Sequence, residues 1–167
     1  LGDVYNRQGM NDGEQSWATV MEDFDNDGDF DAFIVNHTDA NRFMLNNGDG
    51  TFTDIIATTG IDANDLGAWE AAAGDFDNDG WVDIFSEVAG GIYRNNGDGT
   101  FTDINVPFGK GGIGDLNNDG FLDIYSGGSN IRVNDGNQNN WVKINLQGIV
   151  SNRMGIGSRI EIYGSWG

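Results

Sequence analysis

Three copies of a nine-residue acidic loop hold the residues of this sequence best suited to chemistry. The copies are DFDNDGDFD at Asp23–Asp31, DFDNDGWVD at Asp75–Asp83 and DLNNDGFLD at Asp115–Asp123. Oxygen-bearing side chains occupy loop positions 1, 3, 5 and 9, and glycine occupies position 6, where it permits a tight turn. Oxygen atoms at this spacing are the ligands of a hard cation such as Ca²⁺. The sequence therefore predicts about three calcium ions, one in each loop.

The predicted ligands occupy the same positions in each copy, with a backbone carbonyl at position 7 and a closing carboxylate at position 9. They are Asp23, Asp25, Asp27, Asp29 and Asp31 in the first copy, Asp75, Asp77, Asp79, Trp81 and Asp83 in the second, and Asp115, Asn117, Asp119, Phe121 and Asp123 in the third. Asn117 replaces a charged ligand by a neutral one, so the third site is expected to bind more weakly. Because the clustered like charges repel one another unless a cation neutralises them, folding and metal binding should be coupled.

Two other interpretations of the loops are weaker. An EF-hand requires a glutamate at position 12, where these copies have Ile34, Ser86 and Ser126. The segments that follow the loops, AFIVN, IFSEV and IYSGG, are short and rich in β-branched and aromatic residues, as strands are. A solvated turn would explain one copy. Three copies with the same oxygen spacing favour a metal loop between two strands.

An internal repeat extends beyond the acidic loops. The segment LNNGDGTFTDI at Leu45–Ile55 recurs as RNNGDGTFTDI at Arg94–Ile104. Each repeat should contain a strand, the acidic loop, a second and a third strand, the NNGDG turn and a fourth strand with Thr-Phe-Thr. Phe52 and Phe101 are expected to face the core between adjacent sheets.

The NNGDG segment is predicted to be a hairpin turn, because asparagine and glycine tolerate the positive φ angles that such turns require. An alternative is a second oxygen-rich cation site that includes Asp49 and Asp98. Trp17 and Trp69 precede their acidic loops by a few residues and are interpreted as packing residues, with stacking on a sugar as the alternative.

The units resemble the FG-GAP or VCBS repeats of integrin-type β-propellers, most closely in AAGDFDNDGWVDI around Asp75 and in Gly114-Asp115 of the third copy. This resemblance implies an all-β fold of propeller-like blades, about three four-stranded repeats in a partial or open array with a C-terminal β segment. Propellers generally need at least four blades to close a ring. We expect repeats at 1–54, 55–103 and 104–138, followed by a tail at 139–167.

The tail, NNWVKINLQGIVSNRMGIGSRIEIYG at Asn139–Gly164, resembles the opening of the ASPIC/UnbV module that follows such repeats in cartilage-acidic-protein-like and many bacterial secreted proteins. The resemblance rests on Asn140-Trp141, Leu146, Gly148, Ser151-Asn152-Arg153 and Gly155-Ile156-Gly157. It ends early, at Gly167. The alternation of Val142, Ile144 and Leu146 predicts a β-strand that would pair with a sheet.

Composition limits the partners. The 167 residues carry a formal charge of −19 with only eight Lys and Arg, which disfavours nucleic acid and anionic membranes. No apolar stretch reaches the length of a membrane helix, so we expect no membrane insertion. Cysteine is absent. The sequon Asn36-His37-Thr38 and the calcium loops favour an extracellular location, secreted or at the cell surface, where calcium is plentiful.

These observations favour a calcium-stabilised, non-catalytic repeat module for adhesion or self-assembly. Its expected partners are calcium and other protein, either further blades of a longer chain or identical copies that propagate into a filament. A glycan-binding module is the alternative, suggested by the five tryptophans Trp17, Trp69, Trp81, Trp141 and Trp166. An enzyme acting on polysaccharides is disfavoured, because His37 has no evident nucleophile and Glu22, Glu70 and Glu87 more plausibly flank the repeats.

Overall fold

The computed structural model describes residues 8–10, 14–64, 69–86, 91–106, 111–126 and 130–149, with 153, 155, 158–160 and 162. The strands are β1 (Ser16–Glu22), β2 (Asp31–Asn36), β3 (Arg42–Asn46), β4 (Phe52–Asp54), β5 (Ala71–Gly74), β6 (Asp83–Ser86), β7 (Gly91–Asn95), β8 (Phe101–Asp103), β9 (Gly112–Gly114), β10 (Asp123–Tyr125) and β11 (Ile131–Arg132). A short helix, α2 (Ile56–Thr59), follows β4. None of the described helices is long and apolar enough to cross a membrane.

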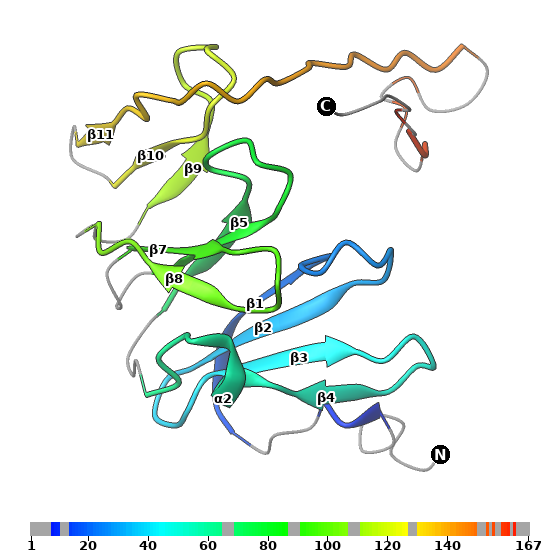
Figure 1. Cartoon of the computed structure of the whole chain (residues 1–167), viewed down its shortest axis with the longest axis vertical. Coiled ribbons are helices and arrows are strands. Elements are labelled where there is room, and N and C mark those ends of the chain that lie inside the picture. The colour runs from blue at the N-terminus through cyan, green and yellow to red at the C-terminus, as the bar shows by residue number, and fades with distance from the viewer. Residues whose placement is uncertain are drawn as a thin grey trace.

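The strands form three antiparallel sheets, in the orders β1-β2-β3-β4, β5-β6-β7-β8 and β11-β10-β9. The sheets are stacked in chain order along the long axis of the molecule (Figure 1). Each acidic loop connects the first two strands of its sheet. We call each sheet, with its acidic loop and the turn that follows its third strand, the first, second or third repeat. This is the all-β, blade-like architecture expected from the sequence.

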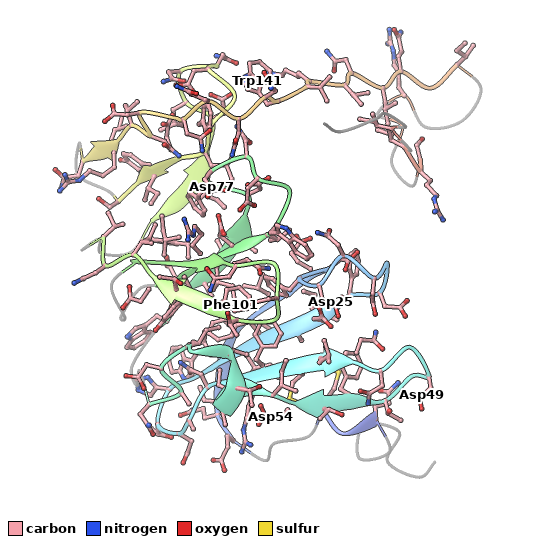
Figure 2. The ribbon with its side chains drawn as sticks, in the orientation of Figure 1. Asp25, Asp49, Asp54, Asp77, Phe101 and Trp141 are labelled. Carbon is pink, nitrogen blue, oxygen red and sulfur yellow. The ribbon has the colours of Figure 1, made fainter. Side chains whose placement is uncertain are left out.

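Burial follows from this stacking. Strand β1 lies at a sheet edge and alternates between exposed and half-buried residues, whereas β2, which lies between β1 and β3, is buried along its whole length. The core between the first two sheets contains Phe24, Phe43 and Phe101, whose rings lie 5.2 to 6.1 Å apart. Phe101 therefore occupies the inter-sheet position expected for it (Figure 2).

Phe52 differs from its counterpart Phe101. It is only half-buried and packs beside Met44 and Met10 on the outer side of the first sheet. The expectation that both phenylalanines lie between adjacent sheets is therefore wrong for Phe52. The reason is positional, because the structure describes no sheet before the first one.

The third sheet also departs from the predicted pattern. It has three strands, and the described residues contain no fourth strand after β11. Residues 139–149 run away from the body of the molecule without joining a sheet (Figure 1). The tail segment with alternating apolar residues thus pairs with no strand among the described residues, and its Val142 and Ile144 are exposed.

Candidate metal centres in the acidic loops

The first carboxylate of each loop holds the backbone of the turn. Asp75 accepts hydrogen bonds from the N–H groups of Asp79 (3.1 Å) and Gly80 (2.9 Å). Asp23 and Asp115 make the same pair of bonds in the other two loops. The chain can curve this tightly because position 4 is an asparagine with positive φ in all three copies and position 6 is a glycine with φ between 93° and 98°.

The last carboxylate of each loop is buried and joins two strands. Asp83 accepts hydrogen bonds from the N–H of Phe76 (2.9 Å) and from the N–H of Asn95 at the end of β7 (2.8 Å). Asp31 and Asp123 make equivalent pairs. Each oxygen retains a lone pair after accepting one bond, so this anchoring role leaves the carboxylate able to face a cation.

Two of the loops bring three carboxylates together. Oxygen atoms of Asp75, Asp77 and Asp83 lie within 4.8 Å of one another, and so do those of Asp23, Asp25 and Asp27. The Oδ1 atom of Asp77 is buried and accepts no hydrogen bond. A buried carboxylate oxygen without a partner costs free energy unless a cation or donor satisfies it. The carboxylates of the second loop could therefore hold a metal ion.

Several predicted ligands are not part of these two groups. Asp29, Asp31 and Asp79 lie outside these two groups. The third loop forms no such group of three acidic residues among the described ones, because position 3 is an amide. The Nδ2 of Asn117 donates instead to Asp119 at 2.7 Å. The weaker calcium binding expected of the third loop stays a prediction.

Burial and neighbouring charges raise the pKa of several carboxyl groups in the first two loops. Burial raises the pKa of Asp77, and the nearby charges of Asp79 and Asp75 raise it further. The pKa of Asp25 is raised in the same way, first by burial. Burial raises the pKa of Asp83 to about 7 against the bonds from Asn95 and Phe76 that lower it. Without a cation these raised pKa values favour the protonated form of Asp25, Asp77 and Asp83.

The residues at position 7 cover the hairpin turns. A side-chain atom on Gly97 would collide with the ring of Trp81, and one on Gly136 would collide with Phe121. Asp29 occupies the corresponding place beside Gly48. These side chains therefore pack on the turns, which leaves only their backbone carbonyls for the predicted ligand role.

The NNGDG segments have turn chemistry. Asp49 accepts hydrogen bonds from the N–H and the hydroxyl of Thr51, and Asp98 makes the same bonds with Thr100. The bond from the threonine hydroxyl lowers the pKa of each carboxyl. Neither carboxylate belongs to a group of three acidic ligands among the described residues. The geometry therefore favours the hairpin interpretation over the second cation site.

Asparagine side chains join the repeats to one another, a role that the sequence interpretation missed. Asn26 donates to the backbone oxygen of Gly80 (3.1 Å), and Asn78 donates to that of Gly120 (3.0 Å). In the opposite direction Asn95 donates to the oxygen of Phe24 (2.8 Å). For the bonds made by Asn26 and Asn78 the sequence did contain a sign of this role, because an asparagine stands at position 4 of every loop.

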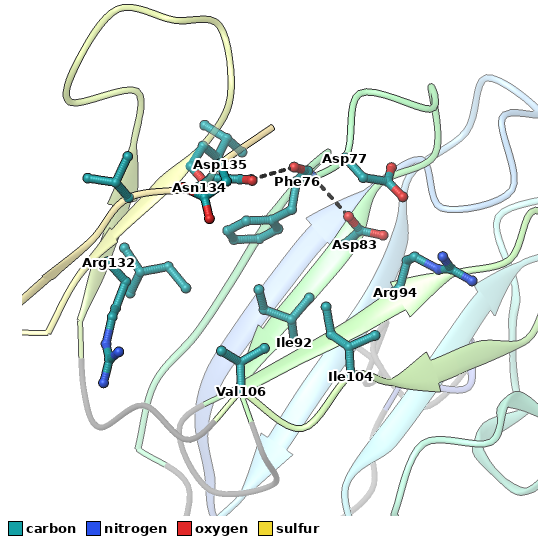
Figure 3. Close-up of a pocket in the computed structure, with 13 residues that line it drawn as sticks. Phe76, Asp77, Asp83, Ile92, Arg94, Ile104, Val106, Arg132, Asn134 and Asp135 are labelled. Atoms are coloured by element: carbon teal, nitrogen blue, oxygen red, sulfur yellow. Dashed lines mark hydrogen bonds between the residues drawn. The ribbon is translucent and has the colours of Figure 1, made fainter. Parts of the chain in front are cut away.

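Asn134 makes the second bond of the latter kind, to the oxygen of Phe76 at 2.7 Å. Both residues line a cavity of about 380 Å³ between the second and third sheets (Figure 3). Its lining includes apolar Ile92, Val106 and Ile124 with charged Arg94 at the rim. At the first junction Phe101 from a fourth strand fills the core, whereas the third sheet has no described fourth strand to supply an equivalent.

An aromatic cluster lies at the other end of the strands. Trp17, His37 and Trp69 have ring centroids 4.4 to 5.1 Å apart, and both tryptophans remain substantially exposed. The neighbouring sequon residue Asn36 is fully buried, and its Nδ2 donates to the oxygen of Ala40. The folded chain therefore does not present Asn36 for glycosylation, and the sequon is no support for an extracellular location.

Comparison with known families adds one finding to this geometry. Residues 23–86 match the model of the FG-GAP-like repeat. The match begins at the first acidic loop and ends with β6, so it includes both loops that gather three carboxylates. It does not extend to the tail, where the resemblance to an ASPIC/UnbV module stays a prediction. A comparison with curated proteins found no match.

Proposed function

We propose that the chain is a calcium-stabilised, non-catalytic repeat module that acts outside the cell in adhesion or assembly. The observation that carries this proposal is the buried Asp77 oxygen without a hydrogen-bond donor, placed within 4.8 Å of ligand atoms of Asp75 and Asp83. The match to FG-GAP-like repeats supports the same function, because repeats of this family are generally structural or binding units.

Calcium would act on the architecture rather than on a substrate. An ion held by Asp75, Asp77 and Asp83 would neutralise the charges that now repel one another. Because Asp83 also anchors Phe76 and Asn95, the ion would fix the loop relative to β7. The loop of the first repeat would hold its ion through Asp23, Asp25 and Asp27. The third loop, with Asn117, would hold its ion less tightly.

Thermal unfolding tests this function directly. Calcium at about 100 times its dissociation constant stabilises a protein by about 2.7 kcal/mol per site. For a chain of this size we expect a rise in Tm of roughly 5–10 °C per occupied site. Magnesium should act less well, because it requires a stricter octahedral shell. A Tm that is the same in millimolar calcium and in chelator would refute the proposal.

Glycan binding is the second candidate, and the exposed Trp17–His37–Trp69 cluster is the observation that favours it. Exposed indole rings can stack on the apolar face of a sugar. If the cluster binds glycans, oligosaccharides should quench tryptophan fluorescence in the wild type and not in Trp17→Ala. Trp141→Ala, which alters an exposed tryptophan on the tail, is the control. Equal quenching in both variants would argue against a site at this cluster.

A further inference from the structure

The third repeat leaves uncovered an apolar side chain that the other two repeats bury. Position 2 of the acidic loop is Phe24 in the first repeat and Phe76 in the second, and these are 3% and 5% exposed. Each lies in the core at the junction with the repeat that follows. The corresponding Leu116 of the third repeat is 50% exposed. The last of the described repeats therefore carries one uncovered half of a junction.

The first repeat carries the other half. Position 8 is Val82 in the second repeat and Leu122 in the third, and each packs into the core of the junction with the preceding repeat. The methyl group of Leu122 lies directly over Gly74. The corresponding residue of the first repeat is Phe30, which is 59% exposed. Met21 is also exposed, whereas its counterparts Ala73 and Ile113 pack into the two junctions.

The hydrogen bonds that join neighbouring repeats also lack one partner in the first and in the third repeat, among the described residues. Asn26 and Asn78 donate to a carbonyl of the following repeat, whereas Asn118, at the same position of the third repeat, is exposed and makes no such bond to a described residue. Asn95 donates both to its own repeat, at Val82, and to Phe24 of the preceding one.

Asn46 is the counterpart of Asn95 in the first repeat. Its Nδ2 donates only to Phe30 of its own repeat, at 3.1 Å, among the described residues. Each amide nitrogen has two hydrogens. The described first and third repeats thus each offer an amide donor, a backbone carbonyl acceptor and an apolar side chain that match those of the other.

We propose that the third repeat of one copy binds the first repeat of a second copy, with Phe30 of the second copy packed against Leu116. In this pairing Asn118 donates to the carbonyl of Gly28, and Asn46 donates to the carbonyl of Leu116, as at the internal junctions. The inference rests on the assembly role proposed above and identifies its partner. Because the two surfaces differ, the contact is head-to-tail and gives a closed ring or a filament.

Two complementary variants test the pairing, each of which damages one half of the contact. Phe30→Asp removes the apolar contact of the first repeat, and Leu116→Asp removes that of the third. Both positions are exposed, so each variant should fold as the wild type does. Val142→Asp, at an exposed position of the tail, is the matched control. Sedimentation velocity in calcium and physiological salt, which screens the charge of −19, would report the mass.

The wild type and Val142→Asp should form species larger than the 18.1 kDa monomer as concentration rises. Each complementary variant alone should remain monomeric. A one-to-one mixture of the two should form a species of twice the monomer mass and no larger one, because only one intact contact remains. A wild type that is monomeric at every concentration, or a mixture no larger than its components, would overturn the pairing.

Calcium titration of the same samples separates this test from that of the proposed function. Full calcium binding by a protein that stays monomeric would reject the pairing and leave the calcium module intact. Head-to-tail association in a protein that binds no calcium would support the pairing and reject the calcium module.

Discussion

The side-chain amide of Asn78 donates to the backbone oxygen of Gly120 at 3.0 Å, and so connects the acidic loop of the second repeat to that of the third. Asn26 and Gly80 make the same connection one repeat earlier. The loops are therefore linked in series along one side of the stack. An ion bound in one loop would restrain the carbonyl acceptor or the amide donor of the neighbouring loop, and would so couple the stability of adjacent repeats.

Asn95→Ala should destabilise the fold by about 3 kcal/mol, because it leaves the buried carbonyl of Phe24 and the half-buried carbonyl of Val82 without their donor. Asn46→Ala is the matched control. Asn46 donates to one carbonyl, on an exposed residue, so its loss should cost about 1 kcal/mol. Chemical denaturation in calcium would measure both. Equal costs would show that the bond between repeats contributes nothing.

Asp77→Asn should have opposite effects with and without calcium. Without calcium it removes a charge that Asp79 and Asp75 repel, so Tm should stay the same or rise by a few degrees. With calcium it removes a ligand charge, so the calcium-induced rise in Tm should shrink by about half or more. Asp98→Asn makes the same charge change in an exposed turn and should leave the calcium response unaltered. A full calcium response in Asp77→Asn would contradict its role.

The pH dependence of the calcium-free protein should reflect Asp83. Its pKa is about 7 in the folded state and near 3.8 when unfolded, so the folded state binds more protons between these values. This contribution to stability is complete below about pH 4 and is lost as pH rises through 7. The free energy of unfolding in chelator should therefore fall from pH 5 to pH 8.

Asp83→Asn should flatten this dependence, although the raised pKa values of Asp25, Asp31 and Asp77 leave part of it. The comparison is of slopes, because an amide at this position loses one of the two backbone bonds and lowers stability at every pH. Denaturation at several pH values would provide the slopes. A slope unchanged by Asp83→Asn would place the titrating group elsewhere.

Local patterns predicted much of this fold. The strand before and after each acidic loop, the hairpin at Asp49 and the burial of Phe101 all follow from residues close together in sequence. The roles of Asp31, Asp83 and Asp123 as anchors were not predicted. Each binds the N–H of an asparagine 11 to 15 residues away, at or just after the end of the third strand, and spacing within the loop carries no information about that partner.

The sequence-based predictions that were wrong have a common cause. They concern side chains whose burial depends on what packs against the outer face of a repeat. Phe52 and Phe101 have the same neighbours in sequence, but among the described sheets only Phe101 has one in front of it. Trp17 and Trp69 contact each other as predicted for packing residues, yet they remain exposed because no described element covers them. In a repeat protein each unit is buried by its neighbours, so identical segments differ at the ends of the stack.

Calcium titration by calorimetry, with chelator-treated protein, is the most direct test of the central claim that the acidic loops hold calcium. We predict three binding events, of which the third-loop event is weakest because Asn117 replaces a carboxylate. Asp77→Asn should lose or greatly weaken one of the two tighter events, while Asp98→Asn should retain all three. A chain that takes up no calcium at millimolar concentration, or an Asp77→Asn variant that binds as the wild type does, would contradict the account.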